Sequence, residues 1–185
     1  GSVFGVSISG GGTTQNIYNN TIHTISSTTG GVFGIEASNS NATHNIYGNT
    51  IHTLSTAGTT SGNSAYGITN SGASVTLNIY QNHIYNISSN GASASLAAGL
   101  NIGGTNARVY NNFIFDVRNA NGISTATSPS ARGIALNTGT SNFYIYHNTV
   151  YLGYTATSAT NSSAALFTSA ALTADIRNNI FVNNV

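Results

Sequence analysis

A short pattern of apolar and polar positions recurs six times along the chain. Each copy has an apolar residue, then a tyrosine in five of the six copies, an asparagine two positions later, and a second apolar residue two positions after that. The copies occupy residues 16–22, 45–51, 78–84, 108–114, 144–150 and 175–181. Neighbouring copies lie 29 to 36 residues apart. Self-similarity at this period indicates a solenoid of stacked repeats.

A second pattern lies between these copies, a small residue followed by alternating apolar positions. It occupies residues 5–8, 34–37, 67–70, 99–102 and 133–136, with a degenerate copy at 165–168. Both patterns alternate with a period of two and are rich in β-branched and aromatic residues, which predicts strands. The Gly, Ser, Thr and Asn segments between them predict turns. Each period therefore predicts one coil made of short strands.

Helix is the alternative for residues 93–100 and 162–171, because alanine and leucine dominate both segments and favour helices. A solenoid of helical pairs would need apolar spacings of three and four over two helices per period. The tyrosine-asparagine pattern is too short and too rich in β-branched residues for that. Alignment with the other repeats therefore favours strands in both segments.

Coils of this kind satisfy their backbone hydrogen bonds only by stacking on one another. Strands about 4.8 Å apart would place six coils in a prism roughly 29 Å long. Three walls of inward-facing residues then follow from the alternation. One wall contains Ile17, Ile46, Ile79, Val109, Ile145 and Ile176. The second contains Ile22, Ile51, Ile84, Ile114, Val150 and Phe181, and the third contains Val6, Ile35, Ile68, Leu100, Ile134 and Leu166.

The chain must bend sharply between the first two walls, within about two residues. Such a bend favours a left-handed backbone conformation, which asparagine tolerates and β-branched residues do not. We therefore expect the constant asparagines at this corner to serve the turn, without any further function. They are Asn20, Asn49, Asn82, Asn112, Asn148 and Asn179.

The six copies resemble the repeats of the pectate-lyase-like right-handed parallel β-helix superfamily, in which an asparagine ladder lines a tight turn between two strands. They also resemble the Asn-, Thr- and Ser-rich repeats of large bacterial surface proteins. The resemblance implies an all-β fold, a right-handed single-stranded parallel β-helix of about six coils with three short strands each. It does not imply one activity, because the superfamily includes lyases, hydrolases, tailspikes and passive adhesins.

Charge is scarce in this chain and narrows the classes of partner. Charged residues make up 4% of the sequence, compared with roughly 25% in an ordinary globular domain. The net charge is +1, and all four basic residues are arginines. Nucleic-acid binding depends on several Lys or Arg contacts to phosphate, so it is not expected. No basic stripe or apolar run of about 18 residues predicts membrane insertion. Cysteine is absent, which excludes disulfides and thiolate metal sites.

The candidate catalytic groups are few. Glycosidase chemistry needs two carboxyl groups within about 5–9.5 Å, and calcium needs six to eight oxygen ligands. The only acids, Glu36, Asp116 and Asp175, fall on three different predicted walls. His23 and His52 occupy equivalent positions, but zinc requires three or four protein ligands and Tyr85 follows them in the column. The sequence therefore predicts no catalytic residue, no metal site and no cofactor.

The tyrosines of the repeat predict a column on the outside of the solenoid, formed by Tyr18, Tyr47, Tyr80, Tyr110 and Tyr146 and ending at Arg177. One interpretation is a ladder that stabilises the sheet by cross-strand packing, with Arg177 capping it through a cation–π contact. The other is a binding strip for sugar rings or for a partner surface, because aligned amphipathic aromatic side chains suit both.

These features predict that residues 1–185 form one β-helix segment of a longer repeat array. We expect a non-enzymatic structural or adhesive repeat of an exported bacterial protein, located outside the cell or on its surface. One alternative is a carbohydrate-binding or carbohydrate-active domain whose tyrosine column binds glycan. A second is a filament subunit that stacks end to end on identical subunits, because neither end of the sequence contains a recognisable cap.

Overall fold

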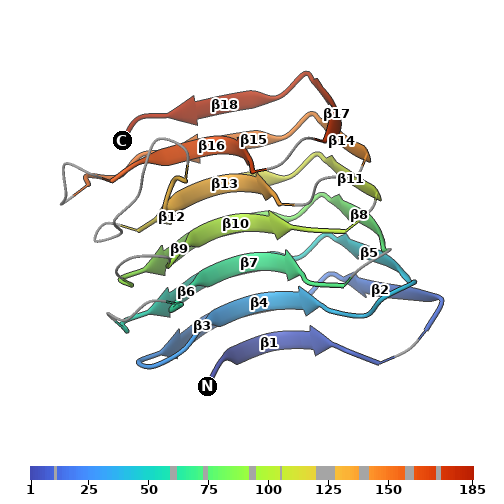
Figure 1. Ribbon diagram of the computed structural model, residues 1–185, viewed down its shortest axis with the longest axis horizontal. Coiled ribbons are helices and arrows are strands. Elements are labelled where there is room, and N and C mark those ends of the chain that lie inside the picture. The colour runs from blue at the N-terminus through green and yellow to red at the C-terminus, as the bar shows by residue number, and fades with distance from the viewer. Residues whose placement is uncertain are drawn as a thin grey trace.

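A computed structural model describes residues 1–10, 12–58, 62–72, 75–91, 95–104, 106–119, 128–137, 142–156, 161–169 and 172–185. All regular structure in these ranges is β-strand, and the strands stack coil upon coil between the two termini (Figure 1). Within the same ranges, no helix has the length and apolar character needed to cross a membrane. The all-β fold predicted from the repeats is therefore confirmed.

Three parallel six-stranded sheets form the walls of the solenoid. The first sheet contains β1 (Val3–Ile8), β4 (Val32–Ala37), β7 (Ala65–Asn70), β10 (Ala97–Ile102), β13 (Ala131–Leu136) and β16 (Ser163–Thr168). The second contains β2 (Thr14–Tyr18), β5 (Thr43–Tyr47), β8 (Thr76–Tyr80), β11 (Asn106–Tyr110), β14 (Asn142–Tyr146) and β17 (Thr173–Arg177). The third contains β3 (Thr21–Ser27), β6 (Thr50–Thr56), β9 (His83–Ser89), β12 (Phe113–Arg118), β15 (Thr149–Leu152) and β18 (Ile180–Asn183).

The coils wind in a right-handed sense. In Figure 1 the strands of the first sheet face the viewer and point to the right, and the chain returns behind them through the second and third sheets. Successive coils rise from the N-terminus to the C-terminus, which makes the path a right-handed helix. This is the hand that parallel strand crossovers adopt almost without exception.

The three inward walls predicted from the sequence form the core. Ile46, Ile79 and Val109 are fully buried and in register on neighbouring strands of the second sheet. The same columns are less covered in the last coil, where Ile176 is 42% exposed. An end coil packs against one neighbour only, so its inward side chains lack a partner on the other side.

Both segments with helical propensity contain a strand, and none of their described residues is helical. Residues 97–102 form β10, and residues 163–168 form β16. Each pairs in the same register as the equivalent strands of the neighbouring coils. Residues 93–94 and 170–171 of these segments lie outside the described ranges. Hydrogen bonding between coils therefore outweighs the helix propensity of alanine and leucine.

The core has a fourth column that period-two alternation does not predict. In the strands of the third sheet it adds Leu54, Ile87 and Val117, each fully buried three residues after the preceding inward residue. The residue just before each of these added inward residues has a left-handed backbone, for example Thr53 (φ 56°) before Leu54. This conformation turns the strand so that two residues three positions apart both face the core. The Thr53 hydroxyl lies 2.9 Å from His52 Nδ1.

The constant asparagines do not adopt the left-handed conformation that we expected of them. Positive φ belongs to the residue before each of them, such as Gln81 at 55° and Asn111 at 54°. That preceding position accepts several residue types, listed in chain order as Asn19, Gly48, Gln81, Asn111, His147 and Asn178. The turn therefore does not explain why the following residue is always asparagine.

Hydrogen bonding between coils explains why this position is always asparagine. Asn82 donates from its backbone N–H and from Nδ2 to Asn112 Oδ1, at 3.0 Å each. It also donates from Nδ2 to the backbone oxygen of Ile46 at 2.9 Å. Its own Oδ1 accepts the backbone N–H and Nδ2 of Asn49, at 3.1 and 3.0 Å. Only a primary amide supplies both the acceptor and the two donors that this position requires.

One buried residue, His44, breaks the apolar pattern of the core. It is fully buried in β5, in register with Gln15 and Leu77, and neither ring nitrogen has a hydrogen-bond partner of good geometry among the described residues. Burial lowers the pKa of His44, with a smaller opposing effect from the backbone of Asn39. The neutral form is therefore the one compatible with the fold.

We expect His44→Leu to stabilise the protein and to reduce its sensitivity to acid. Leu77 shows that the column accepts leucine, and the change removes an unsatisfied polar group that costs about 1–3 kcal/mol. Because the folded pKa lies below the unfolded value of about 6.5, the contribution of His44 is complete above that pH and declines below it. Urea unfolding at pH 7.5 and 5.0 measures both effects.

The control for this experiment is Gln15→Leu, which replaces the neighbour of His44 in the same column and removes no titratable group. It should leave the loss of stability between the two pH values close to that of the unchanged protein. An equal loss in His44→Leu and in the unchanged protein would mean that His44 is not the acid-sensitive group.

Candidate binding face

The outward side of the second sheet carries three continuous columns of polar and aromatic side chains, which we call the tyrosine face. Strand pairing sets all three in register. The first column is Thr14, Thr43, Thr76, Asn106, Asn142 and Thr173. The second is Asn16, Asn45, Asn78, Arg108, Tyr144 and Asp175. The third is Tyr18, Tyr47, Tyr80, Tyr110, Tyr146 and Arg177.

The tyrosine rings of the third column stack face to face. Ring centroids are 5.0 Å apart between Tyr18 and Tyr47, and 4.8 Å apart in the next two pairs, which end at Tyr110. The ring planes are within 3° of parallel. Each inner ring therefore has both faces covered by its neighbours, and the column presents ring edges and hydroxyl groups. Burial and the neighbouring tyrosines raise the pKa of Tyr47, so its hydroxyl stays protonated.

The stack was expected to contain five tyrosines, but the ring contacts in the described residues join only the first four. Tyr146 is in register with Tyr110, but its hydroxyl donates to Asp175 Oδ2 at 2.8 Å and accepts Arg177 Nη2 at 3.3 Å. The polar end group of Asp175 and Arg177 therefore holds the fifth ring.

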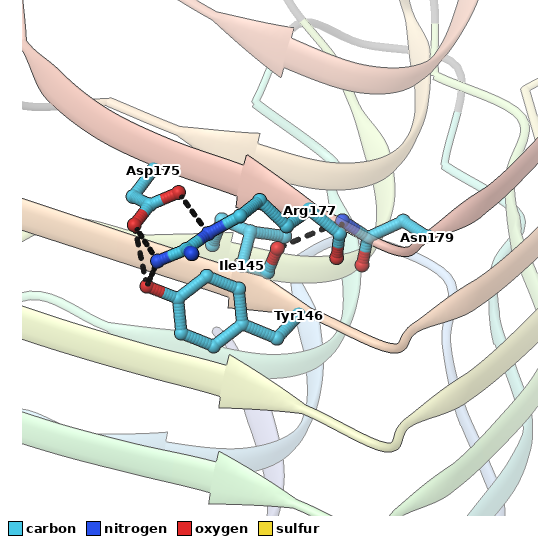
Figure 2. Close-up of polar contacts among 5 residues, drawn as sticks. All are labelled: Ile145, Tyr146, Asp175, Arg177 and Asn179. Carbon is cyan, nitrogen blue, oxygen red and sulfur yellow. Dashed lines mark hydrogen bonds and ion pairs between the residues drawn. The ribbon is translucent and has the colours of Figure 1, made fainter.

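Figure 2 shows this end group, in which Asp175 and Arg177 lie beside the ring of Tyr146. Arg177 Nε donates to Asp175 Oδ1 at 2.7 Å, and its Nη2 makes a second contact with the same carboxylate. The guanidinium carbon lies 5.1 Å from the centroid of the Tyr146 ring. Hydrogen bonds from Arg177, then from Tyr146, lower the pKa of Asp175. The predicted cation–π cap is therefore present, and an ion pair between Asp175 and Arg177 accompanies it.

The second column of the tyrosine face begins with an amide chain. Asn45 Nδ2 donates to Asn16 Oδ1, and Asn78 Nδ2 donates to Asn45 Oδ1, each at 2.8 Å. The column continues with Arg108, whose guanidinium carbon lies 5.6 Å from the centroid of the Tyr144 ring. A hollow of about 310 Å³ lies here, lined by Thr76, Leu77, Asn106, Ala107, Arg108 and Tyr144. Hydroxyl, amide, guanidinium and aromatic groups therefore converge at one place on this face.

The three acids of the chain lie on three different sheets, as the sequence predicted. Glu36 is on β4, where its Oε2 accepts the Ser7 hydroxyl at 3.2 Å. Asp116 is on β12 and pairs with Arg118 at 2.5 Å. Asp175 is on β17, in the end group of the tyrosine face. Each carboxylate thus interacts with a neighbour on its own sheet, and none faces another carboxylate across a strand pair.

The histidine pair also lies where the sequence placed it. His23 and His52 stack with ring centroids 5.1 Å apart, and Tyr85 continues the column at 4.7 Å. In the described part of the chain, no group of three or more His, Cys, Asp or Glu side chains could hold a metal ion.

Two further features were not singled out in the sequence, an aromatic cluster on the surface and a buried arginine. The third sheet carries an outward aromatic cluster of His83, Tyr85, Phe113 and Phe115, with ring centroids 4.8 to 5.3 Å apart. Alternation of aromatic residues after the turn, as in residues 113–115, is the signal that could have predicted it.

The second feature is Arg132 on β13. It is 5% exposed, and its guanidinium carbon lies 4.0 Å from the centroid of the Phe167 ring. Arg132 Nε donates to the backbone oxygen of Pro129 at 2.8 Å. Burial lowers the pKa of Arg132, with a smaller opposing effect from Tyr66. Nothing in the local sequence distinguished this arginine, because its burial depends on the coil that follows it.

Comparisons of the chain with protein-family models, with curated proteins and with solved structures found no match. The fold and the stacked asparagine hydrogen bonds are those of a parallel β-solenoid. Any function therefore has to be argued from the surfaces of that solenoid and from their chemistry.

Proposed function

We propose that this chain is a structural or adhesive repeat segment of an exported bacterial protein, related to the passive members of the pectate-lyase-like β-helix superfamily. The observation that carries the proposal is the tyrosine face, whose columns run in register through all six strands of one sheet. Stacked rings and linked amides make such a face rigid, which suits display of a surface at a fixed distance from an anchor.

The distribution of charge supports a role without catalysis. The acids lie on three separate sheets, and each interacts with a local partner. Hydrolysis or elimination on a glycan would instead need convergent acids and bases around one substrate position. A surface almost free of charge also gives little long-range attraction or repulsion, so contacts with a partner would depend on shape and hydrogen bonding.

The surface location is tested with an antibody raised against residues 1–185 and applied to intact cells of the source organism. We expect labelling without permeabilisation, and loss of the epitope after brief protease treatment of whole cells. A cytoplasmic protein of similar abundance serves as the control and should be labelled only after permeabilisation. Labelling of this chain only after permeabilisation would contradict the export proposal.

Carbohydrate binding is a second candidate function, favoured by the hollow beside Arg108 and Tyr144. The rings inside the tyrosine stack cannot accept a sugar on their faces, because neighbouring rings cover them. A glycan would therefore contact tyrosine hydroxyls and asparagine amides along the column. The aromatic ring available beside the hollow is that of Tyr144, which is 36% exposed.

A glycan array tests this candidate with the unchanged protein and with the Tyr80→Ala and Tyr144→Ala variants, which alter the tyrosine column and the hollow beside it. If the tyrosine face binds glycan, we expect each variant to weaken binding by about tenfold, the equivalent of roughly 1.4 kcal/mol. Tyr85→Ala, which removes a tyrosine from the third sheet, is the matched control and should bind as the unchanged protein does. No binding by any of them, or binding that the two variants leave unaltered, would exclude this candidate.

A further inference from the structure

The hollow beside Arg108 contains a positive charge that no acid in the described part of the chain balances. Glu36 and Asp116 lie on the first and third sheets, away from the second sheet that carries Arg108. Asp175 is on the second sheet, but its carboxylate is held by Arg177. The charge of Arg108 is therefore available to an anion from another molecule.

The Arg108 side chain is also free to form new hydrogen bonds. It is exposed, and among the residues that the structure describes its guanidinium contacts the ring of Tyr144 without a hydrogen bond to any side chain or backbone group. A guanidinium has five N–H donors in a planar fork that matches the two oxygens of a carboxylate. All of these donors can therefore serve a ligand.

The polar groups around Arg108 add further donors. Asn106 Oδ1 already accepts Nδ2 of Asn142 at 3.3 Å, which leaves Nδ2 as the group that Asn106 offers to a ligand. Thr76 and Tyr144 line the same hollow, and each adds a hydroxyl group. An anion bound here would therefore meet a guanidinium, an amide N–H and hydroxyl groups, all of which can donate.

The aromatic groups beside the hollow suit a protein partner better than a sugar. The Tyr80 ring has both faces covered by its neighbours, and the Arg108 guanidinium lies 5.6 Å from the centroid of the Tyr144 ring. Little free ring face remains on which a sugar could stack. Tyrosine and arginine are, in contrast, the residue types that contribute most of the binding energy at protein–protein interfaces, where lysine and acids are depleted.

We propose that the tyrosine face binds a partner protein through an aspartate or glutamate side chain of that partner, which enters the hollow and pairs with Arg108. The inference rests on the proposed adhesive function and specifies its partner as a protein surface with an exposed acid. The pair brings opposite charges together at a place where this chain supplies no acid of its own. Loss of either charge should therefore weaken the complex.

Peptides selected from a random display library on the immobilised protein are the probe for this interaction. The selected peptides are synthesised, and their dissociation constants are measured by isothermal titration calorimetry. We expect each to contain Asp or Glu, and replacing that acid by Asn or Gln should weaken binding about tenfold. Arg108→Gln should cause a similar loss with an unchanged circular dichroism spectrum, because the residue is exposed. The matched control is Arg118→Gln on the third sheet, which should bind the peptides as the unchanged protein does.

Three results would overturn the proposal. They are a selection that yields no binding peptide, selected peptides that lack an acid, and binding that Arg108→Gln leaves intact. A uronic-acid oligosaccharide measured in the same way tests the other source of a carboxylate. If it binds more tightly than the peptides and loses that affinity in Arg108→Gln, the hollow recognises a glycan and the protein partner is excluded. Surface labelling of intact cells is independent of these results, so a failure here leaves the structural role in place.

Discussion

Replacing Asn82 by alanine should lower the free energy of unfolding by about 3–5 kcal/mol, because it leaves two buried backbone groups without partners. Asn82 is 1% exposed and is an inner member of the asparagine ladder. Its removal leaves the backbone oxygen of Ile46 and the backbone N–H of Asn49 without the amide that serves them. Asn112 Oδ1 also loses one of its two donors, Asn82 Nδ2, and keeps only the backbone N–H of residue 82. Urea unfolding measured by circular dichroism gives the change.

The matched control is Asn45→Ala, which removes an asparagine from the outward amide chain of the same solenoid. Asn45 is half-buried and exchanges hydrogen bonds with Asn16 and Asn78, in positions that water can also reach. Its loss should cost about 0.5 kcal/mol. Equal effects at the two positions would mean that the inward ladder contributes no more than a surface hydrogen bond.

Gly67→Ala should lower the free energy of unfolding by about 3 kcal/mol, near the upper end of the usual cost of overpacking a core. A Cβ atom at this position would lie 2.6 Å from the backbone oxygen of Gly99 and 2.6 Å from Ile84 Cγ2. The Gly99 oxygen belongs to β10, which is paired on both sides. It can move away only if neighbouring coils separate. The same urea titration measures this effect.

Gly10→Ala is the control for this prediction, because a Cβ atom there would have no heavy atom within 4 Å. It should leave stability unchanged or raise it by about 0.5 kcal/mol, through a less flexible unfolded chain. A loss of stability in Gly10→Ala as large as that in Gly67→Ala would contradict the steric explanation. The effect would then come from the general preference of this chain for glycine.

Close approach in the core explains the glycine that begins the second repeat pattern. In each coil from Gly5 to Gly133, a Cβ atom would meet both a carbonyl oxygen of the next coil and a side chain of the third sheet. The sequence showed that a small residue recurs there. It did not show the reason, because both contacts join residues that are distant in the chain.

The tyrosine face was also predictable only in part. Register alone placed Tyr18, Tyr47 and Tyr80 in one outward column, and strand pairing confirms this. The sequence did not indicate that the rings stack face to face, so that their faces are unavailable to sugars. That depends on side-chain conformation and on the spacing between coils. The hollow beside Arg108 was equally invisible, because it needs side chains from separate coils.

The amino-acid sequence by itself determined the winding of this protein. Its repeat period, its two-residue alternation and its constant asparagines set the number of coils, the three walls and the inward columns. These are local or strictly periodic properties, so a one-dimensional pattern is enough to express them.

Only the tertiary structure decided which residue bends the corner and what the asparagine does there. Gln81, which has the positive φ, and Asn82, which makes the hydrogen bonds, are adjacent in sequence, but they meet different structural requirements. The first is met within one turn, whereas the second requires an asparagine 30 residues away in the next coil. The burial of His44 and Arg132 was settled in the same way, since the coils stacked on either side determine what a side chain contacts.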